Sequence, residues 1–273
     1  MPIATADLKA LARDMRVDII RMIEAAGNGH PGGSLSVLDL LAVLYWKFLK
    51  HDPQNPDWPH RDRLILSKGH ACPALYAVMA YRGYFPKERL MTLRKLGSPL
   101  QGHPDRLRLP GIEFSSGSLG QGLSVGLGMA ISAKMDKAPW KTYVVLGDGE
   151  LQEGQCWEAL MAAPKFKLDN LVAIVDHNNG QIDGPVDRVM GIEPLEDKLR
   201  AFNWEVRSVD GHDLAAIEDA LARAQECAGK PHAIVAKTVK GKGVSFMENN
   251  IAWHGSAPQK DDADKAVKDI RHG

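Results

Sequence analysis

The sequence predicts an α/β fold in which a doubly wound, mostly parallel sheet carries helices on both faces. Short apolar runs rich in β-branched residues alternate with longer segments whose apolar residues recur at helical spacing. Strands joined through helices pair in parallel, with right-handed crossovers. Ligands of such folds bind beyond the carboxyl ends of the strands, so functional residues are expected to follow the strands directly.

The first third of the chain is expected to be mainly helical. Apolar spacing predicts helices over 7–26, 36–48, 72–82 and 86–94. A glycine-rich turn at 30–33 separates the first two helices, and a loop rich in Pro, Asn and Asp spans 51–59. The short run 63–66 is typical of a buried strand that delivers Ser-Lys-Gly-His (67–70) onto a loop.

The clearest strand signals lie in the second half of the chain. Apolar, β-branched runs predict strands over 142–146, 171–175, 204–209 and 233–239. Helices are expected over 123–135, between the first two of these strands up to about residue 165, and over 213–228. We find no internal repeat, low-complexity tract or convincing linker, so a single domain over residues 1–273 is predicted.

Composition excludes several classes of protein. With 44% hydrophobic and 25% charged residues, the chain has ordinary globular composition. Its 34 Lys and Arg balance 34 Asp and Glu, so no net positive field attracts nucleic acid. Cys72, Cys156 and Cys227 form no CxxC pair, which favours a reducing cytoplasm. No signal peptide or membrane-spanning run is recognised, so cytoplasmic localisation without membrane association is expected.

Polar residues follow two neighbouring predicted strands. Gly147-Asp148-Gly149 comes directly after one strand, and Asn178 lies three residues beyond the next. A carboxylate and an amide oxygen that converge there suit Mg²⁺ or Ca²⁺, with a diphosphate filling other ligand positions. Gly149 permits close approach of the backbone to a phosphate. Either segment alone is typical of an ordinary turn, whereas the pair favours a binding site.

Four of the ten histidines stand beside glycine or proline at predicted loop positions: His30, His70, His103 and His254. A single loop histidine is usually solvated or caps a helix. Four together favour a pocket that handles protons.

The segment 117–122 has the spacing GxxGxG, which differs from the dinucleotide fingerprint GxGxxG. No clear strand precedes it, so a nicotinamide dinucleotide site is not favoured. Its glycines also suit close packing of the following helix, which is the structural alternative.

Together these segments resemble the transketolases. The Gly-Asp-Gly and Asn-Asn segments are similar to the thiamine diphosphate motif, which other enzymes share. Further matches stand in transketolase order: Gly-His-Pro-Gly (29–32), Leu-Ser-Lys-Gly-His (66–70), Gly-His-Pro (102–104), Gly-Ser-Leu-Gly-Gln-Gly (117–122) and His-Gly (254–255). The resemblance spans His30 to Pro258 and implies the thiamine diphosphate-binding fold and diphosphate-binding domain.

The resemblance implies contacts to the cofactor residue by residue. Asp148, Asn178 and the backbone carbonyl of Gly180 match the metal ligands. The residues implied to contact thiamine diphosphate are His70, Gly117, Leu119, Asp148, Gly149, Asn178, Ile182 and His254. Of these, His70 and His254 approach the diphosphate, and Ile182 packs on the thiazolium ring.

Catalytic roles are implied for His30, His103, His254 and Glu153. His30 and His103 line the substrate channel, where they hold sugar hydroxyls and help to move protons. Glu153 matches an acidic residue that links two active sites across the subunit interface. An acidic residue at a helix start is also favoured by the helix dipole in any protein.

The resemblance further implies a second polypeptide. In the family, a pyrimidine-binding domain supplies the glutamate that activates the cofactor, and basic residues outside the diphosphate domain grip the sugar phosphate. Since Gly273 follows the last predicted strand closely, we expect these parts on a partner chain that carries the pyrimidine and C-terminal domains. The expected assembly is an α₂β₂ split transketolase in which this chain is the N-terminal subunit. The surface around its cleft is expected to be apolar.

Alternatives remain for the reaction. The expected activity is transfer of a two-carbon ketol group between sugar phosphates, with thiamine diphosphate and Mg²⁺. A ketol transferase for an unusual sugar or a sulfosugar keeps the cofactor and changes the substrate. Deoxyxylulose phosphate synthase is disfavoured by its single long chain and by the transketolase-like segment 254–258. The remaining alternative is a non-catalytic subunit that only binds cofactor.

Overall fold

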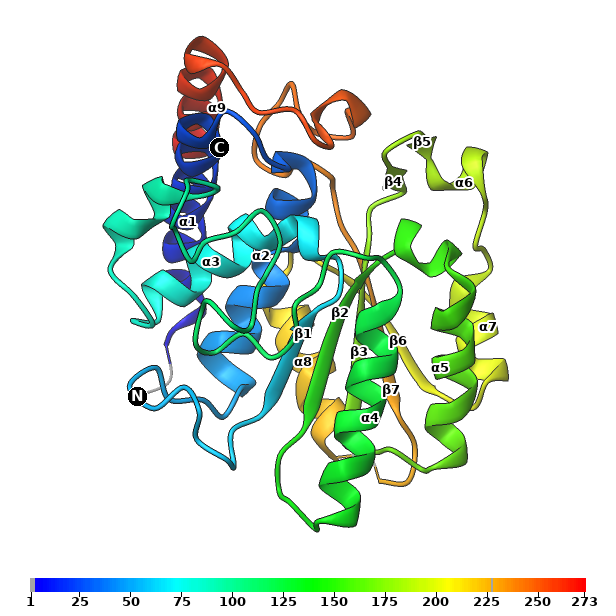
Figure 1. The fold of residues 1–273 in the computed structure, drawn as a ribbon. Helices are drawn as coiled ribbons and strands as arrows, with labels where there is room; N and C mark the ends of the chain where they lie inside the picture. The colour runs from blue at the N-terminus through cyan, green and yellow to red at the C-terminus, as the bar shows by residue number, and fades with distance from the viewer. Residues whose placement is uncertain (1–2, 227) are drawn as a thin grey trace.

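A parallel five-stranded sheet forms the centre of the molecule, with helices on both faces (Figure 1). The computed structural model describes residues 3–226 and 228–273. The strands lie side by side in the order β1 (Arg63–Leu66), β2 (Thr142–Gly147), β3 (Leu171–His177), β7 (His232–Lys237) and β6 (Glu205–Asp210). The predicted fold class is confirmed.

The register of the sheet brings the carboxyl ends of the central strands level. Gly147 at the end of β2 pairs with Asp176 near the end of β3. β2 is buried along its whole length because helices cover both faces of the sheet. Its side chains alternate between the faces, so Val144 packs in one core while Tyr143 and Val145 pack in the other.

Two sets of helices enclose these two cores. One face of the sheet carries α4 (Gln121–Met135), α5 (Gly154–Lys165) and α7 (Leu195–Ala201) (Figure 1). The core on the other face contains residues of α1 (Thr5–Ala26), α2 (Pro31–Val43), α3 (Cys72–Tyr81), α8 (Leu214–Glu226) and α9 (Lys260–His272). Each aliphatic side chain buried in these cores stabilises the fold by about 1.5–3 kcal/mol.

Helix α2 begins at Pro31 instead of the predicted Ser36, so the glycine-rich turn expected at 30–33 is wrong. His30 is the N-cap residue, and Pro31 takes the first helical position, where its missing N–H is not needed. Gly33 serves close packing, because a Cβ there would lie 3.3 Å from Nε2 of His70. The helix continues into a π-helical segment, η1 (Leu44–Phe48).

The predicted helix over 86–94 is instead a short 3₁₀ helix, η3 (Lys87–Thr92). Leu90 is its one buried residue, and Arg94 just beyond it has a φ of 58°, which ends any helical path. Across the predicted segment only Leu90 and Leu93 are buried, so it gains too little from packing to hold an α-helix.

Most other predicted boundaries differ only slightly from the structure, as expected for element ends. The strands predicted over 204–209 and 233–239 are β6 and β7, shifted by one or two residues. The helix predicted over 213–228 is α8, and residue 227 of that prediction lies outside the described residues.

Several elements were not predicted. They are α7, α9, the antiparallel hairpin of β4 (Gly180–Gln181) and β5 (Gly184–Pro185), α6 (Val186–Val189), and the 3₁₀ turns η2 (Gly69–Ala71), η4 (Gly149–Gln152) and η5 (Ile251–Trp253). In α9, a narrow stripe containing Ala263, Ala266 and Ile270 is buried while charged residues fill the rest of the helix. Within the described ranges, no helix has both the length and the apolar character needed to cross a bilayer.

Two glycines of α4 allow a matched test of helix packing on the sheet. A Cβ at Gly126 would overlap Cγ2 of Val144, whereas a Cβ at Gly128 would meet nothing within 4 Å. We expect Gly126→Ala to lower the free energy of unfolding by about 1–3 kcal/mol through overpacking. Gly128→Ala is expected to raise it by up to about 1 kcal/mol through helix propensity. Urea unfolding of both variants measures this, and equal effects would contradict the packing.

Candidate active site

A cleft of about 470 Å³ opens beyond the carboxyl ends of the central strands. Segments that follow β1, β2, β3 and β7 all contribute to its wall. Every residue that was expected to have a role lines it: His30, His70, His103, Gly117, Leu119, Asp148, Gly149, Glu153, Asn178, Gly180, Ile182 and His254. The structure therefore brings all the predicted site residues together at the predicted edge of the sheet.

The four histidines form one cluster, although they come from four separate segments. The ring centroid of His30 lies 5.3 Å from that of His70, 5.6 Å from that of His254 and 6.4 Å from that of His103. His70 and His254 are stacked, with centroids 5.3 Å apart. Such spacing leaves room for a ligand to contact several rings at once.

Burial and nearby positive charge keep these rings neutral. Burial first, and then charges that include Lys240, lower the pKa of His30 to about 4 and that of His254 to about 3. The pKa of His70 is well below its ordinary value, and that of His103 is also lowered. Nδ1 of His30 and Nδ1 of His254 are buried and have no hydrogen-bond partner within the described chain. Neutral imidazoles can both donate and accept hydrogen bonds.

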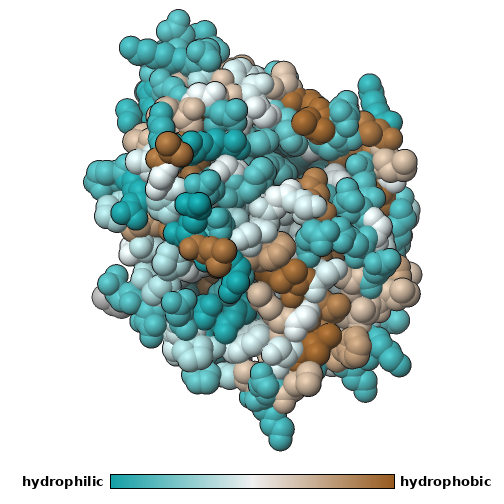
Figure 2. All heavy atoms as spheres, viewed as in Figure 1, coloured by the Kyte–Doolittle hydropathy of each residue, from teal (hydrophilic) through white to brown (hydrophobic). Residues whose placement is uncertain are grey.

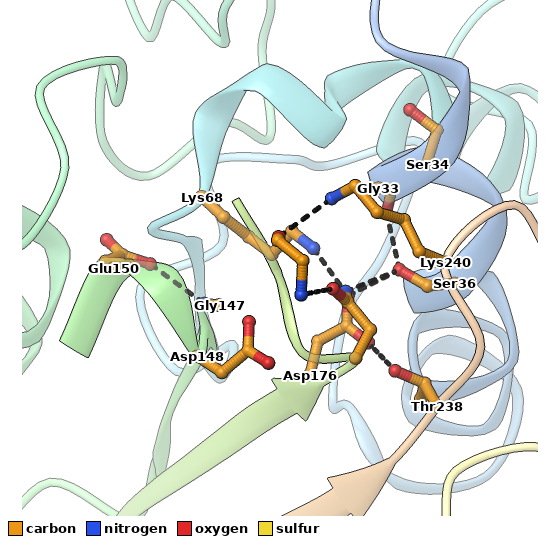
Figure 3. A network of polar contacts seen from close by, with 12 residues as sticks. Gly33, Ser34, Ser36, Lys68, Gly147, Asp148, Glu150, Asp176, Thr238 and Lys240 are labelled. Atoms are coloured by element: carbon orange, nitrogen blue, oxygen red, sulfur yellow. Dashed lines mark hydrogen bonds and ion pairs between the residues drawn. The ribbon is translucent and has the colours of Figure 1, made fainter. Parts of the chain in front are cut away.

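Asp176 organises the floor of the cleft (Figure 3). Its fully buried carboxylate accepts hydrogen bonds from Ser36 at 2.6 Å, from Nζ of Lys68 at 2.5 Å and from the hydroxyl of Thr238. Burial opposes ionisation of this carboxylate, yet Lys68 and the two hydroxyls hold its pKa below the usual range. One side chain thereby joins α2, the loop after β1 and the end of β7.

Asp148 and Asn178 are held in fixed orientations. Oδ1 of Asp148 accepts the N–H of Gly149 at 2.8 Å, and Oδ2 accepts the N–H of Asn179. Oδ1 of Asn178 accepts the N–H of Gly180 at 3.0 Å. Burial, followed by repulsion from a neighbouring aspartate, raises the pKa of Asp148. A cation at this carboxylate would relieve both effects.

Lys240 is the second cation of the floor. It is only 2% exposed, and its Nζ donates to the carbonyl of Gly180 at 3.0 Å. Burial and the charge of Lys68 lower its pKa to about 8. The carbonyl predicted to bind metal therefore already accepts an ammonium hydrogen bond, and its second lone pair stays available.

The candidate metal ligands are unlike a conventional cluster. No three His, Cys, Asp or Glu side chains are grouped as a metal site in the described part of the chain. The donors that converge here are one carboxylate, one amide oxygen and one backbone carbonyl, from Asp148, Asn178 and Gly180. Hard oxygen donors of this kind suit Mg²⁺ or Ca²⁺ when phosphate oxygens complete the shell.

The rim of the cleft holds the remaining predicted residues. A Cβ on Gly117 would lie 3.4 Å from Cγ of His103, so this loop packs closely beside the histidine cluster. Glu153 is the N-cap residue of α5 and lines the cleft. Ile182 is 67% exposed at the tip of the β4–β5 hairpin.

Sequence reasoning missed four charged residues of this site: Lys68, Glu150, Asp176 and Lys240. Each is buried, with Asp176 fully enclosed and the other three 2% exposed. The one sequence signal for these residues is their position, since each stands at or shortly after the carboxyl end of a strand. A charge in such a place is either solvated or part of a buried network, and the sequence does not distinguish the two.

Comparison with known proteins identifies the family to which this chain belongs. Residues 8–272 match the family described as "Transketolase, thiamine diphosphate binding domain", so the fold is that of a thiamine diphosphate-binding domain. The chain belongs to the transketolase family and corresponds to its N-terminal part.

Some relatives have about the same length as this chain, and others are more than twice as long. The 6-deoxy-6-sulfo-D-fructose transketolase subunit of Clostridium sp. strain MSTE9 is 49% identical, over 91% of this chain and 90% of its own length. One subunit of the apulose-4-phosphate transketolase of Phocaeicola vulgatus is 42% identical, over 99% and 95%. The solved transketolase of Campylobacter jejuni superposes with a TM-score of 0.92 at 36% identity, and this chain spans 98% of itself but 43% of that protein.

We expect the stability of the chain to fall as the pH drops through the ordinary histidine range. The unfolded chain binds protons near a pKa of 6.5, whereas the folded pKa of His30 is about 4. Between these values the unfolded state holds more protons, so the free energy of unfolding rises with pH. His30→Asn and His254→Asn each remove one such group and are expected to flatten this slope in urea unfolding.

His272→Asn is the matched control, because His272 ends α9 outside the cleft. Equal slopes in the wild-type chain and in both cleft variants would contradict the lowered histidine pKa values.

Proposed function

We propose that this chain binds thiamine diphosphate and a divalent cation as the N-terminal subunit of a two-chain transketolase. The enzyme would transfer a two-carbon ketol group between sugar phosphates. The observation that carries the proposal is the convergence of four histidines, two buried lysines and three oxygen donors in one cleft. Relatives of matching length bear the names of transketolase subunits, which supports the same conclusion.

The floor of the cleft suits a diphosphate. Lys68 and Lys240 are both 2% exposed, and burial together with the charge of Lys68 lowers the pKa of Lys240, so an anion beside them would be stabilised. A Cβ on Gly33 would lie 3.3 Å from Nε2 of His70 and 3.4 Å from Nζ of Lys68, so glycine lets α2 pack closely against both of these side chains. Phosphate oxygens at these donors would satisfy groups that are otherwise buried at a cost.

The cation would be held by Asp148, Asn178 and the carbonyl of Gly180, and Mg²⁺ is the metal we propose. Its charge would offset the burial that raises the pKa of Asp148. When bound, thiamine diphosphate supplies the nucleophilic carbon that adds to the ketose carbonyl. The protein's own contribution is to bind, orient and exclude water.

Proton handling falls to the neutral histidines. We assign His30 and His103 to the sugar hydroxyls, and His70 and His254 to the diphosphate. Nδ1 of His30 and Nδ1 of His254 have no hydrogen-bond partner in the described chain, so turning either ring toward a ligand would break no hydrogen bond at that atom. Gly117 and Leu119 would contact the aminopyrimidine, and the exposed Ile182 would pack on the thiazolium ring.

A partner chain is part of the proposal. Full-length relatives such as human transketolase are covered over only 42% of their length, so the other parts of the active site would come from a pyrimidine-domain subunit in an α₂β₂ assembly. Apolar side chains gather over α4 on the face shown in Figure 2. Ile182, Val189 and Met190 are 67%, 42% and 63% exposed beside the cleft. Both features are typical of a surface that a partner covers.

We also infer a reducing, cytoplasmic setting. Cys72 and Cys156 are free, buried thiols, and burial raises the pKa of each to about 12. Such thiols are inert as nucleophiles. Cys227 lies outside the described residues.

A second candidate keeps the cleft and changes the sugar. The relative with 49% identity is named for 6-deoxy-6-sulfo-D-fructose, and that with 42% identity for apulose 4-phosphate. A sulfonate and a phosphate are both anionic groups that basic residues can bind. These names favour an unusual ketose as the donor in this second candidate, in place of the common pentose phosphates.

Ketol transfer by the chain with and without a pyrimidine-domain subunit tests the function. We expect activity only in the mixture, with thiamine diphosphate and Mg²⁺, measured from xylulose 5-phosphate and from 6-deoxy-6-sulfofructose to a common aldose acceptor. Preference for the sulfosugar would select the second candidate, and a mixture that binds no cofactor would reject both.

In the same assay, Glu153→Gln is expected to lower turnover while cofactor affinity stays intact, if Glu153 links two active sites.

Asp148→Ala is expected to abolish Mg²⁺-dependent binding of thiamine diphosphate, because the diphosphate would lose its bridging cation. Calorimetric titration of cofactor with and without Mg²⁺ measures this. Asp210→Ala is the matched control, since Asp210 also ends a strand, β6, but lies outside the cleft. Retained metal-dependent binding in the Asp148 variant would refute the metal assignment.

A further inference from the structure

One buried carboxylate connects three loops of the cleft. Glu150 is 2% exposed and stands in η4, just after the Gly-Asp-Gly segment. Its Oε1 accepts the hydroxyl of Ser67 and the N–H of Gly120 at 2.9 Å. Its Oε2 accepts the N–H of Gly147 at 3.0 Å, drawn in Figure 3. Ser67 follows β1, Gly120 precedes α4 and Gly147 ends β2.

The network extends through Ser67. The oxygen of this hydroxyl accepts the N–H of Gly122 at 3.2 Å while its hydrogen is donated to Glu150. A Cβ on Gly122 would overlap the Ser67 side chain, so the first turn of α4 touches the loop after β1 directly. Both oxygens of Glu150 therefore accept hydrogen bonds from the segments that also place Lys68, Leu119 and Asp148 in the cleft wall.

We propose that Glu150 is a positioning residue that fixes the relative placement of these three loops, and thereby the affinity for the cofactor. The inference rests on the proposed function for the identity of the ligand, but the loop geometry itself is independent of it. Glu150 is distinct from the metal ligands and the histidines, and no role was assigned to it from the sequence.

Replacing Glu150 by glutamine keeps the shape of the side chain but removes one of its two hydrogen-bond acceptors. A glutamine amide has one acceptor oxygen and one donor nitrogen, whereas the carboxylate accepts through both oxygens. If the nitrogen replaces Oε2, it opposes the N–H of Gly147. If it replaces Oε1, it opposes the N–H of Gly120. Either rotamer leaves one buried backbone donor without an acceptor.

The direction of the effect separates positioning from charge. Removing a negative charge beside an anionic diphosphate would tighten binding, because it relieves Coulomb repulsion. Loss of loop placement would weaken binding. Glu150→Gln therefore gives opposite results under the two explanations.

The experiment compares Glu150→Gln with Asp62→Asn in the full chain and in its complex with a pyrimidine-domain subunit. Asp62 is also a buried carboxylate, 6% exposed, and accepts the N–H groups of Lys50 at 2.9 Å and Lys141 at 2.8 Å outside the cleft. Amide hydrogen exchange in 117–122 and 147–149 is measured without cofactor, and the Kd of thiamine diphosphate is measured with Mg²⁺.

For Glu150→Gln we expect exchange in both segments to accelerate and the Kd to rise by about tenfold to a hundredfold. Asp62→Asn is expected to lower Tm while leaving exchange in these segments and Kd unchanged. Ser67→Ala, which removes only one hydroxyl of the network, is expected to change exchange and Kd in the same direction and serves if Glu150→Gln does not fold.

Unchanged exchange would overturn the role of Glu150 in holding the loops. Accelerated exchange with unchanged or tighter cofactor binding would overturn its role in placing the cofactor. If the wild-type complex binds no thiamine diphosphate, the proposed function fails and with it the cofactor part of this inference. The exchange measurement still decides the loop part in that case.

Discussion

The buried ion pair between Lys68 and Asp176 is the interaction on which the cleft depends. Nζ and Oδ2 lie 2.5 Å apart, with side-chain exposures of 2% and 0%. Taking both charges out of water is costly, and the pair persists because Ser36 and Thr238 complete the hydrogen bonding of the carboxylate. The hydrogen bond from Ser36 ties α2, and with it His30, to this cluster.

The same cluster sets the chemistry of the walls. Burial first, and then the positive charge of the two lysines in the floor, lower the pKa values of His70 and His254 and keep both rings neutral. The cleft therefore concentrates positive charge at its base and keeps neutral donors and acceptors around it. That gradient suits a ligand with an anionic end and a polar, uncharged reacting end.

Much of the site could be predicted from the sequence because apolar runs show where the strands end. The apolar runs that became β2 and β3 place Asp148 and Asn178 at one edge of a parallel sheet, whatever the helices do. The missed features depend on tertiary packing. Glu150 and Lys240 are polar residues whose burial only the folded chain reveals. Helix α2 starts at Pro31 because Gly33 packs against His70 and Gly32 packs against Lys240. The buried stripe of α9 is too narrow to stand out among its charges.

The strand order also constrains how the protein forms during synthesis. β7 is made last but lies between β3 and β6 in the sheet. Until residues 232–237 leave the ribosome, β6 has no strand to pair with and β3 presents an open edge. The nascent chain must therefore shield the open edge of β3 from residue 177 until β7 emerges, and this last strand completes the sheet and delivers Lys240 in one step.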